Sequence, residues 1–337
     1  MIERSTLEEF NYADQTVAGL LVCAGGFEDR SIAFAKKLNR ARCEIERALV
    51  LQYQSQPEDN EANFGRLMSR LERLVKSQPE SIAVDANTPI QSSLRIKARI
   101  EQVAQTMEDR GAIIDISGMT NLWAIDSIHA CVSCGLQTSV VYTEARWYYP
   151  PKWQHQRVVR AWIDKKYEIA AKYLQSSGLG ASHILPEFGG NFLPGRQTCL
   201  IVFAGYEPNR VEGLVDDYAP GALIVLYGKS PHPELQWRTQ LSKDLHRELF
   251  SRWRVREGEI STLLVDDIVA TLEDEFKIIT GQYDVAIVPH CSKMQAVASY
   301  IFWRRHPEVQ LLFTSPVRFN PDHYSRGSNR TVVYKIG

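Results

Sequence analysis

The stretch "GLLVCAGGFEDR" (residues 19–30) decides the fold, because the chain repeats it as "CLIVFAGYEPNR" (residues 199–210). In both copies an apolar run typical of a buried strand ends in a glycine turn, and a glutamate and an arginine follow. Three further pairs keep the same order: "RALVLQYQSQP" (47–57) with "GALIVLYGKSP" (221–231), "AIIDISGMTN" (112–121) with "DVAIVPHCSK" (284–293), and "VVYTEARWYYP" (140–150) with "LLFTSPVRFNP" (311–321). Four matches in one order indicate a tandem duplication.

Within the first copy, short β-branched runs alternate with longer amphipathic stretches. Runs such as "GLLVC", "ALVLQY" and "AIIDI" are mostly apolar along their length, as in parallel strands that helices cover on both faces. The sequence therefore predicts an α/β protein made of two tandem doubly wound Rossmann-like domains with mainly parallel sheets. The expected boundaries are residues 1–150 for the first repeat, 151–196 for a connecting helix and loop, and 197–337 for the second repeat.

Composition narrows the class of partner. The 337 residues hold 39 Lys+Arg against 40 Asp+Glu, so no affinity for duplex nucleic acid is expected. The chain begins with an acidic, polar stretch and has no apolar run of membrane-spanning length, so we expect a cytoplasmic protein without a signal peptide or membrane contact. "HACVSC" (129–134) lacks a second Cys/His pair at zinc-site spacing, and no metal is expected.

The glycine turn of each copy comes where doubly wound sheets bind ligands, beyond the carboxyl end of a strand. Gly25 and Gly26 allow a tight turn, and the start of the next helix can bind an anion. The guanidinium of Arg30 can add two charged hydrogen bonds to the same anion. The alternative is structural: Glu28 and Arg30 form a salt bridge, and Asp29 or Ser31 caps the helix. "AGGFEDRS" lacks the third glycine of a dinucleotide fingerprint, and "YGKSPHPE" lacks the first glycine of a phosphate loop, so we expect no cofactor and reject an NTPase.

The motif "DISGMTN" (115–121) sets hydroxyls and an amide around Gly118 at a strand end. It resembles the strand-four motif of CRISPR-associated Rossmann-fold (CARF) domains, and the duplicated chain resembles the related SAVED domains of bacterial anti-phage systems. The second copy has "HCSK" (290–293) at this place. The motif departs from the family pattern at Asn121, where a basic residue is expected, and at His290, where glycine is expected. Helix capping is the alternative role for Ser117 and Thr120.

The resemblance implies a sensor of a nucleotide-type small ligand, such as a cyclic oligonucleotide, that acts in defence through a separate effector protein or self-assembly. The expected ligand-binding residues are Gly25, Gly26, Glu28, Arg30, Asp115, Ser117, Gly118, Thr120 and Asn121 in the first copy, and Gly205, Glu207, Arg210, Ser292 and Lys293 in the second.

Two other functions stay open at this stage. An enzyme could cleave an RNA-like ligand through the ligand's own 2′-hydroxyl, with Lys293 stabilising charge and His290 moving protons, or hydrolyse a nucleotide with Asp115 or Glu28 as base. The second function that stays open is a non-catalytic scaffold subunit of a defence complex. The aromatic stretch "EARWYYPPKW" (144–153) could stack on bases, although packing is the favoured interpretation.

Overall fold

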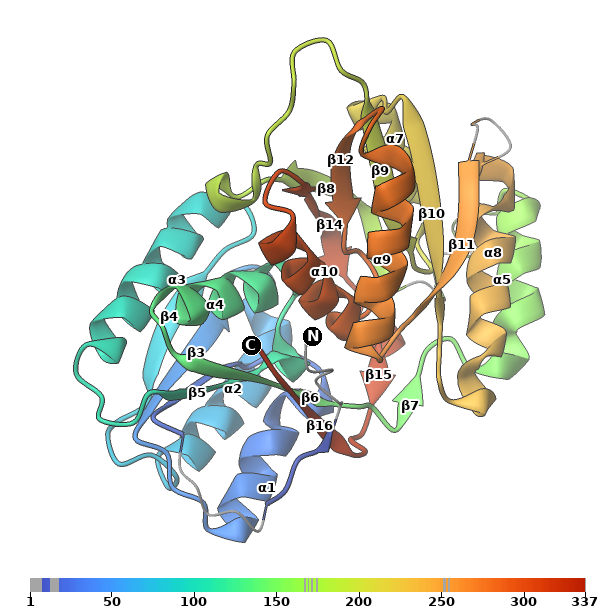
Figure 1. The fold of residues 1–337 in the computed structure, drawn as a ribbon. Helices are drawn as coiled ribbons and strands as arrows, with labels where there is room; N and C mark the ends of the chain where they lie inside the picture. Colours follow the sequence, from blue (N-terminus) through green and yellow to red (C-terminus); the bar gives the residue numbers. More distant parts are fainter. Residues whose placement is uncertain are drawn as a thin grey trace. The chain divides into compact units, whose positions relative to one another are not determined.

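The computed structural model describes residues 8–12, 18–166, 168, 170, 172–173, 175–250, 253 and 255–336. Much of the acidic N-terminal stretch, which is expected not to be a signal peptide, lies outside these residues. The chain forms two compact units (Figure 1). The first comprises Met1–Trp147 together with Ser325–Gly337, and the second comprises Tyr148–Tyr324.

The first unit is built on one sheet, which has seven strands within the described residues in the order β1-β16-β6-β5-β2-β3-β4. The strands are β1 (Glu8–Glu9), β2 (Leu20–Ala24), β3 (Arg47–Tyr53), β4 (Glu80–Val84), β5 (Gly111–Asp115), β6 (Gln137–Thr143) and β16 (Thr331–Lys335). Strands β2 to β6 pair in parallel, whereas β16 runs antiparallel beside β6. Every residue of β2 is buried, as the uniformly apolar run predicts.

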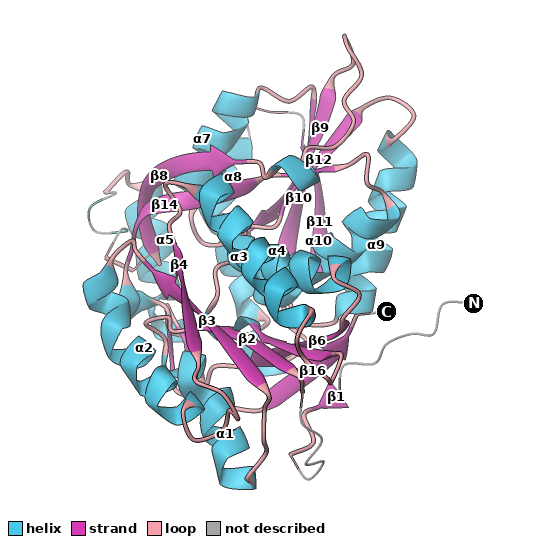
Figure 2. Cartoon of the chain, turned by 90° about the vertical axis from the view of Figure 1, so that its left-hand side faces the viewer, coloured by secondary structure: helices cyan, strands magenta, loops and turns pink. Residues whose placement is uncertain are grey.

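Two pairs of helices cover this sheet: α1 (Ala33–Ala41) with α2 (Pro57–Leu71), and α3 (Pro89–Ala104) with α4 (Asn121–Ser133). Phe34 and Leu38 of α1 and Leu67 of α2 join Cys23 and Val50 of the strands in one apolar core. Figure 2 shows α1 and α2 on one side of the sheet and α3 and α4 on the other.

The second unit repeats the plan with five parallel strands in the order β11-β10-β9-β12-β13. These are β9 (Thr198–Ala204), β10 (Ala222–Lys229), β11 (Val255–Ser261), β12 (Asp284–Val288) and β13 (Gln310–Leu311). A separate antiparallel ribbon joins β14 (Phe313–Phe319) to β8 (Ser176–His183). The helices of this unit include α5 (His155–Ile163), α7 (Pro208–Tyr218), α8 (Trp237–Phe250), α9 (Val265–Ile279) and α10 (Lys293–Arg305).

Both sheets have the order 3-2-1-4-5 when their parallel strands are numbered along the chain, which is the order of a doubly wound fold. The sequence pairs fall on equivalent strands: β2 with β9, β3 with β10, β5 with β12, and β6 with β13 and β14. The predicted fold class of two Rossmann-like domains is confirmed.

The two repeats exchange their last strands. After β6 the chain runs through α5 to β8, which pairs with β14 of the second unit. After β14 the chain returns to β16, which pairs with β6 of the first unit, with Thr331 opposite Thr143. Each unit is therefore completed by a segment that follows the other repeat, as in domain swapping within one chain.

This exchange changes the expected boundaries. Residues 325–337, expected in the second repeat, belong to the first unit, because the β-branched run of β16 pairs with the open edge of β6. The expected connecting segment contains strand β8, whose sequence "SSGLGASH" has low strand propensity and gave no signal.

The aromatic stretch after β6 is held by one buried arginine of the second unit. The Arg238 side chain donates to the carbonyl oxygens of Tyr148, Tyr149 and Pro150, and its Nε donates to Tyr206 Oη at 2.8 Å. Its guanidinium also lies 4.6 Å from the centre of the Tyr206 ring. These contacts give the backbone of residues 148–150 a packing role.

Candidate functional site at the strand ends

The carboxyl ends of β2 and β5 lie side by side in the first sheet, at the point where the strand order reverses. The turns after both strands approach each other closely. A Cβ on Gly26 would lie 2.7 Å from the Gly118 carbonyl oxygen, and a Cβ on Gly118 would lie 2.3 Å from the Ala24 carbonyl oxygen. A Cβ on Gly25 would lie 2.6 Å from the Phe64 Cα. The glycines therefore permit close backbone packing of the two turns.

Glu28 and Arg30 form a buried ion pair at this edge. Arg30 Nη2 lies 2.9 Å from Glu28 Oε2, and Arg30 Nη1 donates to Tyr142 Oη at 2.6 Å. Ser325, from the returning C-terminal segment, donates to Glu28. The predicted salt bridge is confirmed, and the arginine joins the turn after β2 to strand β6.

The expected cap at this helix start is wrong. The Ser31 hydroxyl donates to the Gly26 carbonyl at 2.8 Å, and Asp29 accepts from the Gly327 backbone N–H at 2.9 Å. No side-chain cap bond is formed at the first turn, the 3-10 helix η1 (Asp29–Ile32). Asn63 of α2 instead donates to the carbonyl oxygens of Gly26 and Glu28, so the turn is fixed from a neighbouring helix.

The "DISGMTN" motif forms a second network next to the first. Asp115 Oδ1 accepts from the Ser117 backbone N–H at 3.0 Å and from the Ser117 hydroxyl at 2.5 Å. The Ser117 hydroxyl in turn accepts from the Thr143 N–H of β6 at 2.8 Å. Burial raises the pKa of Asp115 to about 6, against the hydrogen bonds from Ser117 and the charge of Arg30.

Thr120 caps α4, whereas Ser117 does not act as a cap. Thr120 Oγ1 accepts from the Trp123 N–H at 3.5 Å, so the capping interpretation is confirmed for this residue. Tyr53 at the end of β3 donates to the Gly118 carbonyl at 3.0 Å and accepts from the Thr120 N–H at 2.9 Å. Tyr53 was not among the predicted site residues, although its alignment with Tyr227 in the repeated strand was a usable signal.

Accessibility separates the predicted residues of the first unit into two sets. Glu28, Arg30, Asp115 and Ser117 are each at most 8% exposed, and their side chains bind neighbours within the unit. Gly118, Thr120 and Asn121 are partly exposed at the start of α4. The first set positions the turns, and the second can meet a ligand at a helix N-terminus.

The second unit carries the same kind of ion pair. Arg210 Nη1 lies 2.6 Å from Glu207 Oε2, and Arg210 Nη2 donates to the Thr314 carbonyl at 2.7 Å and to Thr314 Oγ1 at 3.1 Å. Ser176 of β8 donates to Glu207. Both units thus have a buried glutamate–arginine pair. In each unit the arginine contacts a strand that follows the last helix, β6 or β14, and a serine from the exchanged segment donates to the glutamate.

His290 extends this network and has no counterpart in the first unit's motif. Its Nδ1 lies 2.9 Å from Thr314 Oγ1, and its Nε2 lies 3.7 Å from Glu207 Oε2. Burial and the charge of Arg210 lower the pKa of His290 to about 4 despite the nearby carboxylate. Burial alone would raise the pKa of Glu207, but Arg210, His290 and Ser176 outweigh it and lower that pKa to about 2. At neutral pH the carboxyl is therefore charged and the imidazole neutral.

Ser292 and Lys293 lie at the start of α10. Ser292 and Gln295 form a capping box, and the Ser292 hydroxyl also donates to the Thr262 carbonyl at 2.7 Å. Lys293, the first residue of the helix, is partly exposed. A Cβ on Gly205 would meet His290 at an ordinary 3.9 Å, so packing does not require glycine there.

The candidate catalytic residues fall in different units: Asp115 is in the first, and His290 and Lys293 are in the second. The His290 side chain is only 3% exposed, and because its pKa is lowered to about 4 the imidazolium form, which would act as a general acid, is not populated at neutral pH. Within the described part of the chain, no group of three His, Cys, Asp or Glu side chains could hold a metal ion.

No protein-family model matches the chain, and no curated protein sequence matches it. Among solved structures, the chain is similar to a Type III CRISPR defence DNA nuclease activated by cyclic oligoadenylate, at 10% identity and a TM-score of 0.47 over 93% of this chain and 68% of the other. It is also similar to a short-chain dehydrogenase from Oenococcus oeni PSU-1, at 8% identity and a TM-score of 0.21 over 74% and 96% of the two chains. A third structure, the NADP-bound N-domain of a bacterial malonyl-CoA reductase, has 8% identity and a TM-score of 0.23 over 87% and 80%. All three TM-scores are below 0.5.

Proposed function

We propose that the chain is a binding module for a nucleotide-type signal, with the ligand held at the carboxyl ends of the parallel strands. The observation that carries the proposal is the repeated placement of a partly exposed helix start at the strand-order reversal, α4 after β5 and α10 after β12. Backbone N–H groups at helix starts can bind phosphate, and doubly wound sheets bind ligands at this edge.

Within this proposal the buried and exposed residues have different tasks. Thr120 and Asn121 in the first unit and Lys293 in the second are the ligand-facing candidates, because they are partly exposed at the helix starts. The buried Glu28–Arg30 and Glu207–Arg210 ion pairs fix the conformation of the turns after β2 and β9. Asp115 and Ser117 fix the start of α4 relative to β6.

The class of ligand comes from the resemblance of the strand-end motifs to CARF and SAVED domains. It favours a cyclic oligonucleotide in bacterial defence, and a separate effector protein or self-assembly to give the output. In the described residues no helix is long and apolar enough to cross a membrane.

The test is calorimetric titration of the full chain with cyclic di-, tri- and tetranucleotides, ATP and NAD, followed by chromatography of each mixture. We expect one cyclic oligonucleotide to bind, and Asn121→Ala or Lys293→Ala to weaken binding without changing the unfolding midpoint. Thr120→Ser, which keeps the capping oxygen, serves as the conservative control.

Absence of heat with every ligand would refute the proposal for those ligands. An altered ligand peak on the column would instead identify a cleaving enzyme. Equal binding by wild type, Asn121→Ala and Lys293→Ala would show that the ligand does not bind at the helix starts.

A further inference from the structure

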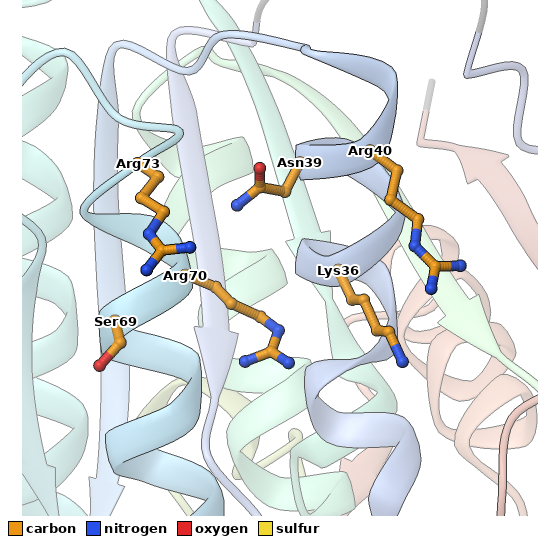
Figure 3. A pocket seen from close by; sticks show the side chains of 6 residues that line it. All are labelled: Lys36, Asn39, Arg40, Ser69, Arg70 and Arg73. Carbon is orange, nitrogen blue, oxygen red and sulfur yellow. The ribbon is translucent and has the colours of Figure 1, made fainter.

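A basic groove lies between α1 and α2 of the first unit. It has a volume of about 270 Å³ and is lined by Lys36, Asn39 and Arg40 from α1 and by Ser69, Arg70 and Arg73 from α2 and the turn after it (Figure 3). The lining therefore contains four cations and two neutral polar side chains, with no carboxylate. This composition is that of an anion site.

The groove is separate from the proposed ligand site. The turn after β2 leads into the N-terminal end of α1, whereas Asn39 and Arg40 lie in its last turn. Arg70 likewise lies in the last turn of α2. Along the axis of α1, Arg40 lies about 10 Å from Ala33, the first residue of the helix, and Lys36 about 5 Å from it.

Charge is concentrated here although the protein is nearly neutral overall. Residues 33–42 and 65–73 contain seven Lys and Arg side chains and one carboxylate, Glu72, in a chain of net charge −1. Within the described residues, Lys36, Arg40, Arg70 and Arg73 have no ion pair with any carboxylate. Arg70 makes one hydrogen bond, to the Arg66 carbonyl at 3.2 Å. Like charges that line one groove repel one another, and a bound anion would reduce that repulsion.

The helix dipole explains only part of this arrangement. Cations are favoured in the last turn of a helix, which explains the position of Arg40 in α1 and of Arg70 in α2. Arg73 directly follows the C-terminal end of α2 and is favoured there too, but Lys36 lies in the first half of α1 and is not favoured by the dipole. All four nevertheless line the same groove.

The side chains suit phosphate better than a single carboxylate. Figure 3 shows Arg70 extending from α2 toward α1 and Asn39 directed back toward α2, while Arg73 runs down beside α2 and Arg40 points away from α2. Arginine forks match the oxygens of phosphate in pairs, and the Asn39 amide adds two neutral donors. Drug-sized sites begin at about 300 Å³, so the groove suits a compact ligand carrying two or three phosphate groups.

From the four cations, their missing carboxylate partners and the size of the groove, we infer that the α1–α2 groove binds a chain of linked phosphate groups. The phosphates belong either to a free oligophosphate or to a short segment of single-stranded nucleic acid. The inference goes beyond the proposed strand-end site, because it assigns a second anion site at the other end of α1.

The experiment titrates the full chain with inorganic triphosphate, which has no base to occupy a nucleotide site, and separately with a ten-nucleotide single-stranded RNA. Arg70→Gln/Arg73→Gln removes two groove charges. Arg95→Gln/Lys97→Gln on α3 is the matched control, since it removes the same charge from the same unit away from the groove. Circular dichroism checks that all variants fold.

We expect saturable binding of triphosphate that the groove variant weakens at least about tenfold and the control variant leaves within about twofold. Binding and weakening only with the RNA would support the same phosphate chemistry and identify a strand as its source. Failure of both ligands to bind, or equal loss in groove and control variants, would overturn the inference. Tighter groove-dependent binding of polyglutamate than of either phosphate ligand would also overturn it, in favour of a carboxylate partner.

Discussion

Replacing Glu207 by glutamine tests whether the buried ion pair holds the second unit's candidate site together. Its contacts lower the pKa of Glu207 from 4.5 to about 2, and a tenfold change in a proton-binding constant corresponds to about 1.36 kcal/mol. Glu207→Gln should therefore cost about 3 kcal/mol of unfolding free energy at pH 7. A similar loss of about 3–5 kcal/mol is typical when one partner of a buried pair is removed, because Arg210 keeps its charge without a counterion.

The pH dependence follows from the direction in which this pKa is moved. A carboxyl group with a lowered folded-state pKa stabilises the fold fully above its unfolded pKa, and the stabilisation is lost as the pH falls toward the folded value. The difference between wild type and Glu207→Gln should thus shrink to less than about half between pH 7 and pH 3.

The assay is urea unfolding by circular dichroism at both pH values, with hydrogen exchange of β9 and β12 to report on the second unit alone. Glu234→Gln, at an exposed residue between β10 and α8 of the same unit, is the matched control and should change stability by less than about 0.5 kcal/mol. The double variant Glu207→Leu/Arg210→Met should recover much of the loss, because it removes both charges. A loss below about 1 kcal/mol for Glu207→Gln, with no pH dependence, would refute this account of the pair.

Three further substitutions probe the other contacts. Asp115→Asn should be up to about 3 kcal/mol more stable than wild type at pH 8 and within about 1 kcal/mol of it at pH 4, because a carboxyl with a raised pKa destabilises the fold only as it ionises; equal urea midpoints at pH 8 would contradict this. Gly118→Ala should cost at least about 1–3 kcal/mol, since its Cβ would lie 2.3 Å from the Ala24 carbonyl oxygen, whereas Gly65→Ala in an open part of α2 should not destabilise; thermal unfolding of both variants decides. Arg238→Gln should speed proteolysis of residues 148–150 by removing donors to three carbonyl groups, and unchanged cleavage on a timed digest would show that they are held by other contacts.

The parallel sheets of both units could be predicted from sequence because their central strands are buried on both faces. Runs such as that of β2 are apolar throughout and repeat in the second half, so local pattern and global fold agree. The antiparallel strands β8 and β16 were not predicted. β8 consists largely of serine and glycine, and β16 pairs with a strand almost two hundred residues earlier, a partner that no local pattern reveals.

The candidate site was predicted in position but not in the function of each side chain. Residues of the repeated motifs do lie at the strand ends, yet Arg30 and Arg210 point into buried networks. A charged residue after a glycine turn looks the same in sequence whether it faces a ligand or a neighbouring strand. The partners that decide the matter, Tyr142 and Thr314, are more than a hundred residues away.

The returning β16 strand has a consequence for biosynthesis. Residues 331–335 are among the last of these residues to leave the ribosome, and until then the edge of β6 has no antiparallel neighbour. Ser325, which binds Glu28, also arrives late. The N-terminal half is made first but finished last, so nascent chains must keep an open sheet edge while the whole second half is translated. A premature stop shortly before the codons for β16 would therefore damage the part of the protein that was synthesised earliest.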